Sequence, residues 1–217
     1  MTVQESPAFQ GLPVPAIATW SAEQNVSPRV IQRGFGIGYL DPIDDSLARD
    51  HRHVLWTRWS LGRGKGQPQF NSVHPARQRR AMVDLLCQVC FKPAGDEDEG
   101  TLFITGANGR SGSQGPIEDG EITANPPVHL DCALEAAQHC PHLLNGHVAA
   151  RVMYPTSWGV FGTRYDLGGL FPIARPEPTQ VSYDSDDRRF VLAHHVLMEL
   201  DGCQPVDLTK EARRARL

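Results

Sequence analysis

Two short pairs of cysteine and histidine residues constrain this chain more than any other feature of its sequence. The first pair is Cys87-Gln-Val-Cys90 and the second is His129-Leu-Asp-Cys132, with 38 residues between them. Thiolate and imidazole ligands at this spacing suit one tetrahedral zinc ion. The second pair follows Pro126-Pro127 at the start of a predicted helix, so both of its ligands lie on one face of the first turn. The sequence therefore predicts a Zn²⁺ site at Cys87, Cys90, His129 and Cys132.

One ligand of this site has alternatives, because other suitable side chains follow closely. Cys140, or His139 and His142, could replace His129 as a ligand. Four protein ligands of any of these kinds would close the coordination sphere and leave no position for an activated water, so we expect a structural zinc. Motifs of zinc deaminases, nucleotide-binding loops, serine hydrolases and H-E-x-x-H metalloproteases are absent from the sequence. The sequence leaves open whether the protein is an enzyme.

The order of a cysteine knuckle, a hairpin and a helix resembles the treble-clef class of zinc fingers. The resemblance covers about residues 85–142 and rests on Cys87, Cys90, His129 and Cys132. The gap between the pairs is longer than in compact members of that class, and a glycine-rich loop at 106–120 would absorb the excess. The whole chain is also similar to uncharacterised actinobacterial and phage-borne proteins with a knuckle and a Pro-Pro helix start. This resemblance implies a zinc-stabilised module but no particular activity.

The expected fold class is α+β, with a central treble-clef-like zinc module, short antiparallel strands and a C-terminal helix. Strands are predicted at 30–40, 54–60, 101–105, 121–124, 148–154, 158–162, 170–173 and 179–183, and helices at 75–86, 129–139 and 186–200. We expect a loose arm at 1–28, a single domain at 29–208 that contains the zinc module at 85–142, and a basic tail at 209–217.

A basic segment at 51–80 is the second conspicuous pattern. It contains seven Arg or Lys residues and no Asp or Glu, and its aromatic residues are Trp56, Trp59 and Phe70. Cations neutralise phosphates and aromatic rings stack on bases, so the segment suggests contact with nucleic acid or a phosphorylated ligand. The candidate ligand-binding residues are Arg63, Lys65, Arg77, Arg80, His51 and His53. The plainer alternative is that these charges pair with acidic loops and that the tryptophans belong to the core.

Three functions are compatible with these patterns. The first is a zinc-stabilised protein that binds nucleic acid or a phosphorylated ligand through 51–80. The second is a small-molecule enzyme with a pocket lined by His and Arg and a purely structural zinc, and the third is a protein-interaction module. The sequence shows no apolar run long enough to span a membrane and no secretory signal, so we expect a cytoplasmic protein with no membrane partner. It does not indicate an oligomeric state.

Overall fold

The computed structural model describes residues 8–106, 115–168 and 171–214. The chain divides into two compact units. Unit 1 contains Met1–Ile17, Arg80–Ser157 and Met198–Leu217, and unit 2 contains Ala18–Arg79 and Trp158–Leu197. The expected single domain at 29–208 spans parts of both units and stays a prediction, because only the cooperativity of unfolding can test it.

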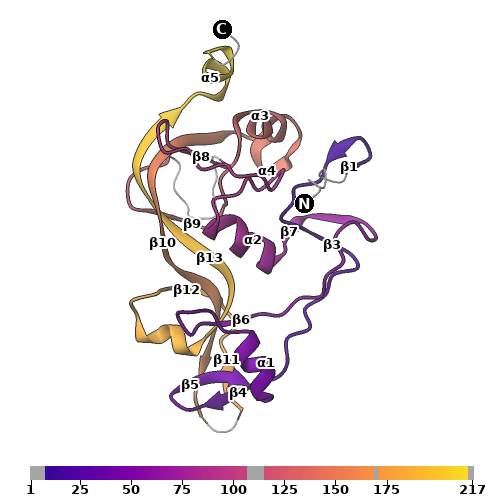
Figure 1. The fold of residues 1–217 in the computed structure, drawn as a ribbon, viewed down its shortest axis with the longest axis vertical. Helices are drawn as coiled ribbons and strands as arrows, with labels where there is room; N and C mark the ends of the chain where they lie inside the picture. The colour runs from indigo at the N-terminus through magenta and orange to yellow at the C-terminus, as the bar shows by residue number, and fades with distance from the viewer. Residues whose placement is uncertain (1–7, 107–114, 169–170, 215–217) are drawn as a thin grey trace. The chain divides into compact units, whose positions relative to one another are not determined.

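Unit 1 combines short helices with strands of an antiparallel ladder. Its elements are β1 (Ala8–Phe9), β2 (Leu12–Pro13), β8 (Thr101–Gly106), β9 (Glu121–Thr123), α3 (Leu130–His139), α4 (Pro141–Leu144), α5 (Leu208–Arg214) and parts of β10 (His147–Asp166) and β13 (Val191–Val206). β8 pairs with the first residues of β10, and β9 pairs with Met198, Glu199 and Leu200 of β13. In Figure 1, α3 and α4 lie beside β8. Their core contains Cys87, Val89, Leu102, Ile104, Val128, Ala133, Leu143, Ala149 and Leu208.

Unit 2 contains two small two-stranded sheets and the remaining parts of the long strands. Its elements are β3 (Ala18–Trp20), β4 (Val30–Arg33), β5 (Gly36–Tyr39), α1 (Pro42–Leu47), β6 (Leu55–Trp56), β7 (Pro68–Val73), β11 (Ile173–Ala174), β12 (Thr179–Ser182), a 3-10 turn at Asp186–Phe190, and most of α2 (Pro75–Val83). β3 pairs with β7 and β4 pairs with β5. β10 pairs with β11 and β12, and β13 pairs in parallel with β6. A separate core contains Val30, Ile37, Tyr39, Ala48, Leu55 and Leu192.

The α+β class is confirmed, but the predicted helix at 186–200 is wrong. Only Asp186–Phe190 is helical, as a short 3-10 turn, and the chain then continues as the strand β13. Apolar residues buried on both faces of the strand make up most of the run from Val191 to Leu200, while His194, His195 and Glu199 are half-buried. A mainly apolar run of this kind satisfies a helical period by chance, and pairing with other strands decides its conformation. The C-terminal helix of the structure is instead α5.

The strands are longer than expected. Those predicted at 148–154 and 158–162 are one strand, β10, of 20 residues. Pro155 lies between them, after the β8 ladder ends at Val152 and before the β12 ladder begins at Gly159. Neither β8 nor β12 therefore requires its missing N–H. The strand predicted at 30–40 is a hairpin, since Gly34 adopts a positive φ between β4 and β5.

Several of the remaining predicted elements are confirmed, while one predicted strand and the N-terminal arm need correction. Elements appear close to the predicted bounds 75–86, 101–105, 121–124 and 129–139, whereas 54–60 keeps only the two residues of β6 as a strand. The expected loose arm at 1–28 is wrong for its described part, because Val14, Ile17 and Trp20 are buried. The basic tail is helical up to Arg214, with Leu208 in the core. Residues 107–114 of the glycine-rich loop lie outside the described residues. No helix in the described ranges has the length and apolar character needed to cross a membrane.

Candidate metal centre

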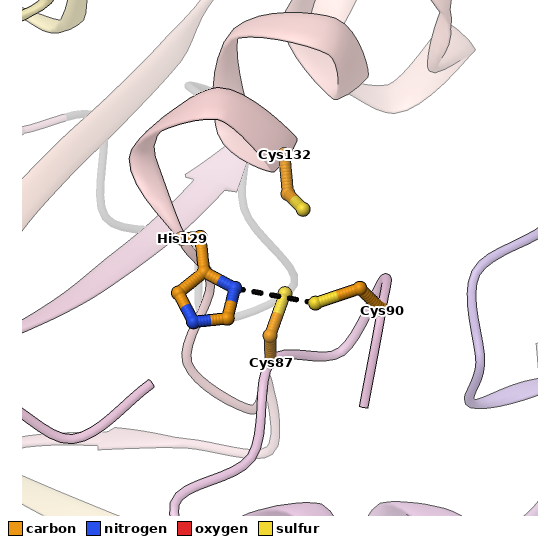
Figure 2. A group of neighbouring side chains, drawn as sticks. All are labelled: Cys87, Cys90, His129 and Cys132. Atoms are coloured by element: carbon orange, nitrogen blue, oxygen red, sulfur yellow. Dashed lines mark hydrogen bonds between the residues drawn. The ribbon is translucent and has the colours of Figure 1, made fainter. Parts of the chain in front are cut away.

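The two Cys/His pairs of the sequence meet in unit 1. The Sγ atoms of Cys87, Cys90 and Cys132 and a ring nitrogen of His129 all lie within 4.8 Å of one another. Figure 2 shows the four side chains pointing toward a common centre, two from the loop after α2 and two from the start of α3. This Cys3His cluster could hold a metal ion.

The first pair lies on a tight backbone turn. The N–H of Phe91 donates to the carbonyl of Cys87, and the N–H of Cys87 donates to the carbonyl of Lys92, both at 2.8 Å. Phe91 closes this turn with a φ of 62°, a conformation that favours glycine. The turn therefore brings the Cys87 and Cys90 sulfurs to one side of the loop, as the C-x2-C spacing predicts.

The N-terminal segment and the approach to α3 both hold this turn. The N–H groups of Ala16 and Ile17 donate to the carbonyls of Val89 and Gln88 at 2.9 and 3.3 Å. The N–H of Gln88 in turn donates to the carbonyl of Pro127 at 2.9 Å. Two segments far apart in the sequence therefore converge on the knuckle, and the second of them leads directly to His129.

The second pair occupies the start of α3. His129 is the N-cap residue, and its carbonyl accepts from the N–H of Ala133 at 2.8 Å, while its side chain makes no capping hydrogen bond. Cys132 follows in the first turn, three residues later, on the same face. The imidazole that could have capped the helix points into the cluster instead.

A hydrogen bond orients the imidazole of His129. Its Nε2 lies 2.7 Å from the carbonyl oxygen of Pro93, which can only accept, so Nε2 carries the proton. In the neutral ring Nδ1 then holds a lone pair, and it faces Cys90 Sγ at 3.2 Å. A ligand histidine is oriented in the same way, with one nitrogen toward the metal and the other donating to a carbonyl. No sequence motif indicates this acceptor, because it is the backbone carbonyl of Pro93.

The close approach of the three thiols shifts their pKa values in different directions. A hydrogen bond from Cys132, assisted by backbone N–H groups of Cys90, His129 and Val89, lowers the pKa of Cys87 to about 4 against the effect of burial. The same hydrogen bond, burial and the neighbouring sulfur charges raise the pKa of Cys132, and burial raises that of Cys90. The protein alone stabilises one thiolate here, and a divalent cation would stabilise the other two.

The cluster contains His129 rather than its alternatives. In the part of the chain that the structure describes, Cys140, His139 and His142 belong to no group of metal-ligand side chains. Cys140 caps the C-terminal end of α3 and contacts the core around Cys87. His139 and His142 lie at the last turn of α3 and in α4.

Three of the seven cations of the basic segment form ion pairs within the described part of the protein. Both terminal nitrogens of Arg77 donate to the carboxylate of Glu23, at 2.6 and 2.7 Å, and this carboxylate is fully buried. Arg77, a candidate ligand-binding residue, is therefore held in a mostly buried ion pair and not on an exposed positive surface. Arg80 is exposed and pairs with Asp84, its neighbour one helical turn away. Arg58 pairs with Asp44.

The other candidate residues of the basic segment are scattered. Burial and the charge of Arg77 lower the pKa of Arg63, which is half-buried, whereas Lys65 is exposed. His51 and His53 are exposed in a turn, and His53 has a φ of 61°, so they do not share one face of a strand. Neither lines the cavity of about 570 Å³ in unit 2 whose walls include Arg29, Tyr165 and Phe171.

The aromatic residues of this segment follow the plainer alternative in part. Trp56 is buried in β6. Trp59 is half-buried and contacts His74 edge to face, with 5.7 Å between ring centroids. Phe70 is half-exposed on β7. One exposed ring does not make a platform on which successive bases could stack.

Comparison of the chain with protein-family models, curated proteins and solved structures finds no match. The likeness to treble-clef fingers and to actinobacterial and phage-borne proteins therefore rests on the sequence motifs alone.

Proposed function

We propose that this is a zinc-stabilised protein in which Cys87, Cys90, His129 and Cys132 hold one structural Zn²⁺. The observation that carries the proposal is the approach of these four ligand atoms to within 4.8 Å of one another. Among the common divalent metals, zinc is the one best suited to a ligand set of three sulfurs and one imidazole nitrogen. The tautomer of His129, with Nε2 committed to Pro93, supports the same assignment.

A structural role fits the surroundings better than a catalytic one. Four protein side chains fill a tetrahedral shell and leave no position for a bound water. Cys87 is fully buried, and Cys90 and Cys132 pack against the same apolar cluster. Zinc there would join the knuckle to α3 and stabilise the core of unit 1, since binding energy at a closed site is folding energy.

We also propose that the zinc module at about residues 85–142 has a treble-clef topology. A knuckle followed by strands and a helix that brings the second ligand pair supports it. One feature differs from the expected hairpin: β8 and β9 pair with β10 and β13, and in the described ranges they do not pair with each other. The knuckle and the helix start resemble that class, while the strands between them belong to a larger sheet.

Metal analysis of protein purified without added zinc tests the proposal directly. We expect about one equivalent of zinc per chain, lost in Cys132→Ala and His129→Ala. Cys140→Ala and His139→Ala are matched controls that should keep the metal. A folded wild-type protein without zinc would contradict the proposal. Loss of zinc in Cys140→Ala but not in His129→Ala would assign the fourth ligand differently.

Nucleic-acid binding through 51–80 has weaker support. Of its candidate cations, Arg77 is buried against Glu23 and Arg80 pairs with Asp84, which leaves Arg63 and Lys65. Binding to single-stranded DNA or RNA, measured against salt concentration, tests this alternative. A steep salt dependence that Lys65→Ala reduces would support it. The enzyme and protein-interaction alternatives have no observation of their own in their favour.

A further inference from the structure

Arg52 and Arg79 differ from most arginines of unit 2. Arg33, Arg49, Arg58, Arg77 and Arg164 each form an ion pair with an Asp or Glu of the same unit. Within the described ranges, no carboxylate lies at ion-pair distance from Arg52 or Arg79. In the described residues of this unit, these two charges therefore lack a direct acidic partner, as do those of Arg29, Arg63, Lys65 and Arg188.

Aromatic rings hold both guanidinium groups in place. The central carbon of Arg52 lies 4.0 Å from the centroid of the Tyr183 ring, and that of Arg79 lies 4.7 Å from the Trp56 ring. A guanidinium stacked on a ring keeps its edge free, so its N–H groups can donate in plane to oxygen atoms. Stacking thus orders these side chains without using their donors.

The two arginines belong to one cluster. The Oδ1 of Asp50 accepts from the backbone N–H of Arg52, and its Oδ2 accepts from Nε1 of Trp56, each at 2.9 Å. Burial, with the charge of Asp50, raises the pKa of Tyr183 to about 12, while Arg52 and Arg79 act in the opposite direction. The contacts of Asp50 and of the two rings therefore link both arginines to Tyr183, whose phenol stays protonated and can donate.

The donors of this cluster are open to solvent. Arg52 and Arg79 are half-exposed, and none of their nitrogens is among the buried polar atoms without a partner in the described residues. One donor is used, since Nε of Arg52 lies 3.3 Å from Nε2 of His51. The carboxylate of Asp50 is occupied by two backbone N–H groups and the indole, so it fixes the turn rather than either guanidinium.

We propose that Arg52 and Arg79, with the hydroxyl of Tyr183, form a binding site for a phosphate group. Phosphate oxygens accept in-plane hydrogen bonds from arginine better than from any other side chain. Two positive charges exceed the single charge of Asp50, so the cluster attracts an anion. The site lies wholly in unit 2 and does not depend on the metal proposal.

Calorimetric titration of the full chain with inorganic phosphate, at constant ionic strength, tests this site. We expect binding that Arg52→Gln or Arg79→Gln weakens about tenfold or more, because each removes a charge-assisted donor pair. Arg79→Lys should also weaken it, since lysine keeps the charge but loses the planar fork. Arg175→Gln is the control, because it removes the same charge from an exposed pair with Asp166.

Absence of phosphate binding to the wild type, or equal affinity in all variants, would overturn the site. Melting curves show whether each variant is folded, and Arg52→Gln carries the test if Arg79→Gln unfolds, because Arg52 lies in a surface turn. Competition by a single-stranded oligonucleotide that is lost in Arg79→Gln would identify the phosphate as part of a polynucleotide. Phosphate binding without such competition would identify a small phosphorylated ligand.

Discussion

The Cys/His cluster of unit 1 and the basic segment 51–80 are the two densest patterns in the sequence, but folding uses them differently. The four residues of the first pattern act on one another, and their ligand atoms meet within 4.8 Å. Three cations of the second pattern, Arg58, Arg77 and Arg80, pair with carboxylates outside the segment. Arg77 finds Glu23, which lies 54 positions away along the chain.

The difference has a physical cause. Metal-ligand spacing encodes local geometry, because a two-residue spacer in a turn or a helix start places both side chains on one side. The spacing of charged residues along the sequence does not define a geometry of this kind. An arginine pairs with whichever carboxylate the fold places beside it. A run of like charges therefore predicts a binding surface only where the fold leaves the charges unpaired, as at Arg52 and Arg79.

Removal of a cysteine ligand should produce the largest effect. We expect Cys90→Ala to lose zinc and to destabilise unit 1 severely, because structural zinc contributes on the order of 10 kcal/mol to folding. Soluble yield, zinc content and thermal melting measure this. Cys203→Ala is the control, since that thiol lies outside the cluster, and it should change stability by less than about 1 kcal/mol. Identical melting temperatures of Cys90→Ala and wild type would show that the metal does not stabilise the fold.

Arg77→Ala should cause the second largest loss of stability, although no metal is involved. It leaves the buried carboxylate of Glu23 without its partner, and breaking a buried pair in this way costs about 3–5 kcal/mol. Denaturant unfolding measures the loss, and Glu23→Gln combined with Arg77→Met should recover part of it. An unchanged denaturation midpoint for Arg77→Ala would contradict a stabilising role for its ion pair with Glu23.

Acid should weaken unit 2 through its buried carboxylates. Burial raises the pKa of Glu23 and Asp45, but hydrogen bonds from Arg77 and Arg49, with backbone N–H groups, outweigh it, so both pKa values are below their ordinary values. A lowered folded-state pKa gives stability that is present above the unfolded pKa of about 4 and lost as pH falls below it. The free energy of unfolding from pH 7 to 3 should therefore fall less steeply in Asp45→Asn than in wild type. Parallel curves for the two proteins would contradict this.

Arg80→Ala should have the smallest effect. Its ion pair with Asp84 is exposed, and such a pair contributes about 0.5 kcal/mol or less. Its guanidinium also lies 5.6 Å from the centroid of the Phe91 ring, a contact of similar size at an exposed site. Denaturant midpoints at low and high salt should differ little from wild type. A loss above about 2 kcal/mol would show that the cation supports the knuckle through Phe91.

The sequence predicted the local parts of the site better than the fold around it. The C-x2-C turn and the start of α3 follow from spacing, proline and helix propensity, all of which act within a few residues. β13 was predicted as a helix because Phe190, Ala193, Leu197 and Leu200 satisfy a helical period, while its pairing with β6 and β9 involves residues far away in the sequence. The burial of Val14 and Trp20 also depends on distant contacts, and composition alone made that segment look loose.

The convergence of distant segments on the knuckle has a consequence for the unfolded chain. A metal that joins Cys90 to His129 is a cross-link around the 38 residues between them. By chain-entropy arguments such a link disfavours the unfolded ensemble by about 4 kcal/mol. Doubling the enclosed length would change this by only about 0.6 kcal/mol. Insertions between the ligand pairs should therefore be tolerated far more readily than a change of one residue within either pair.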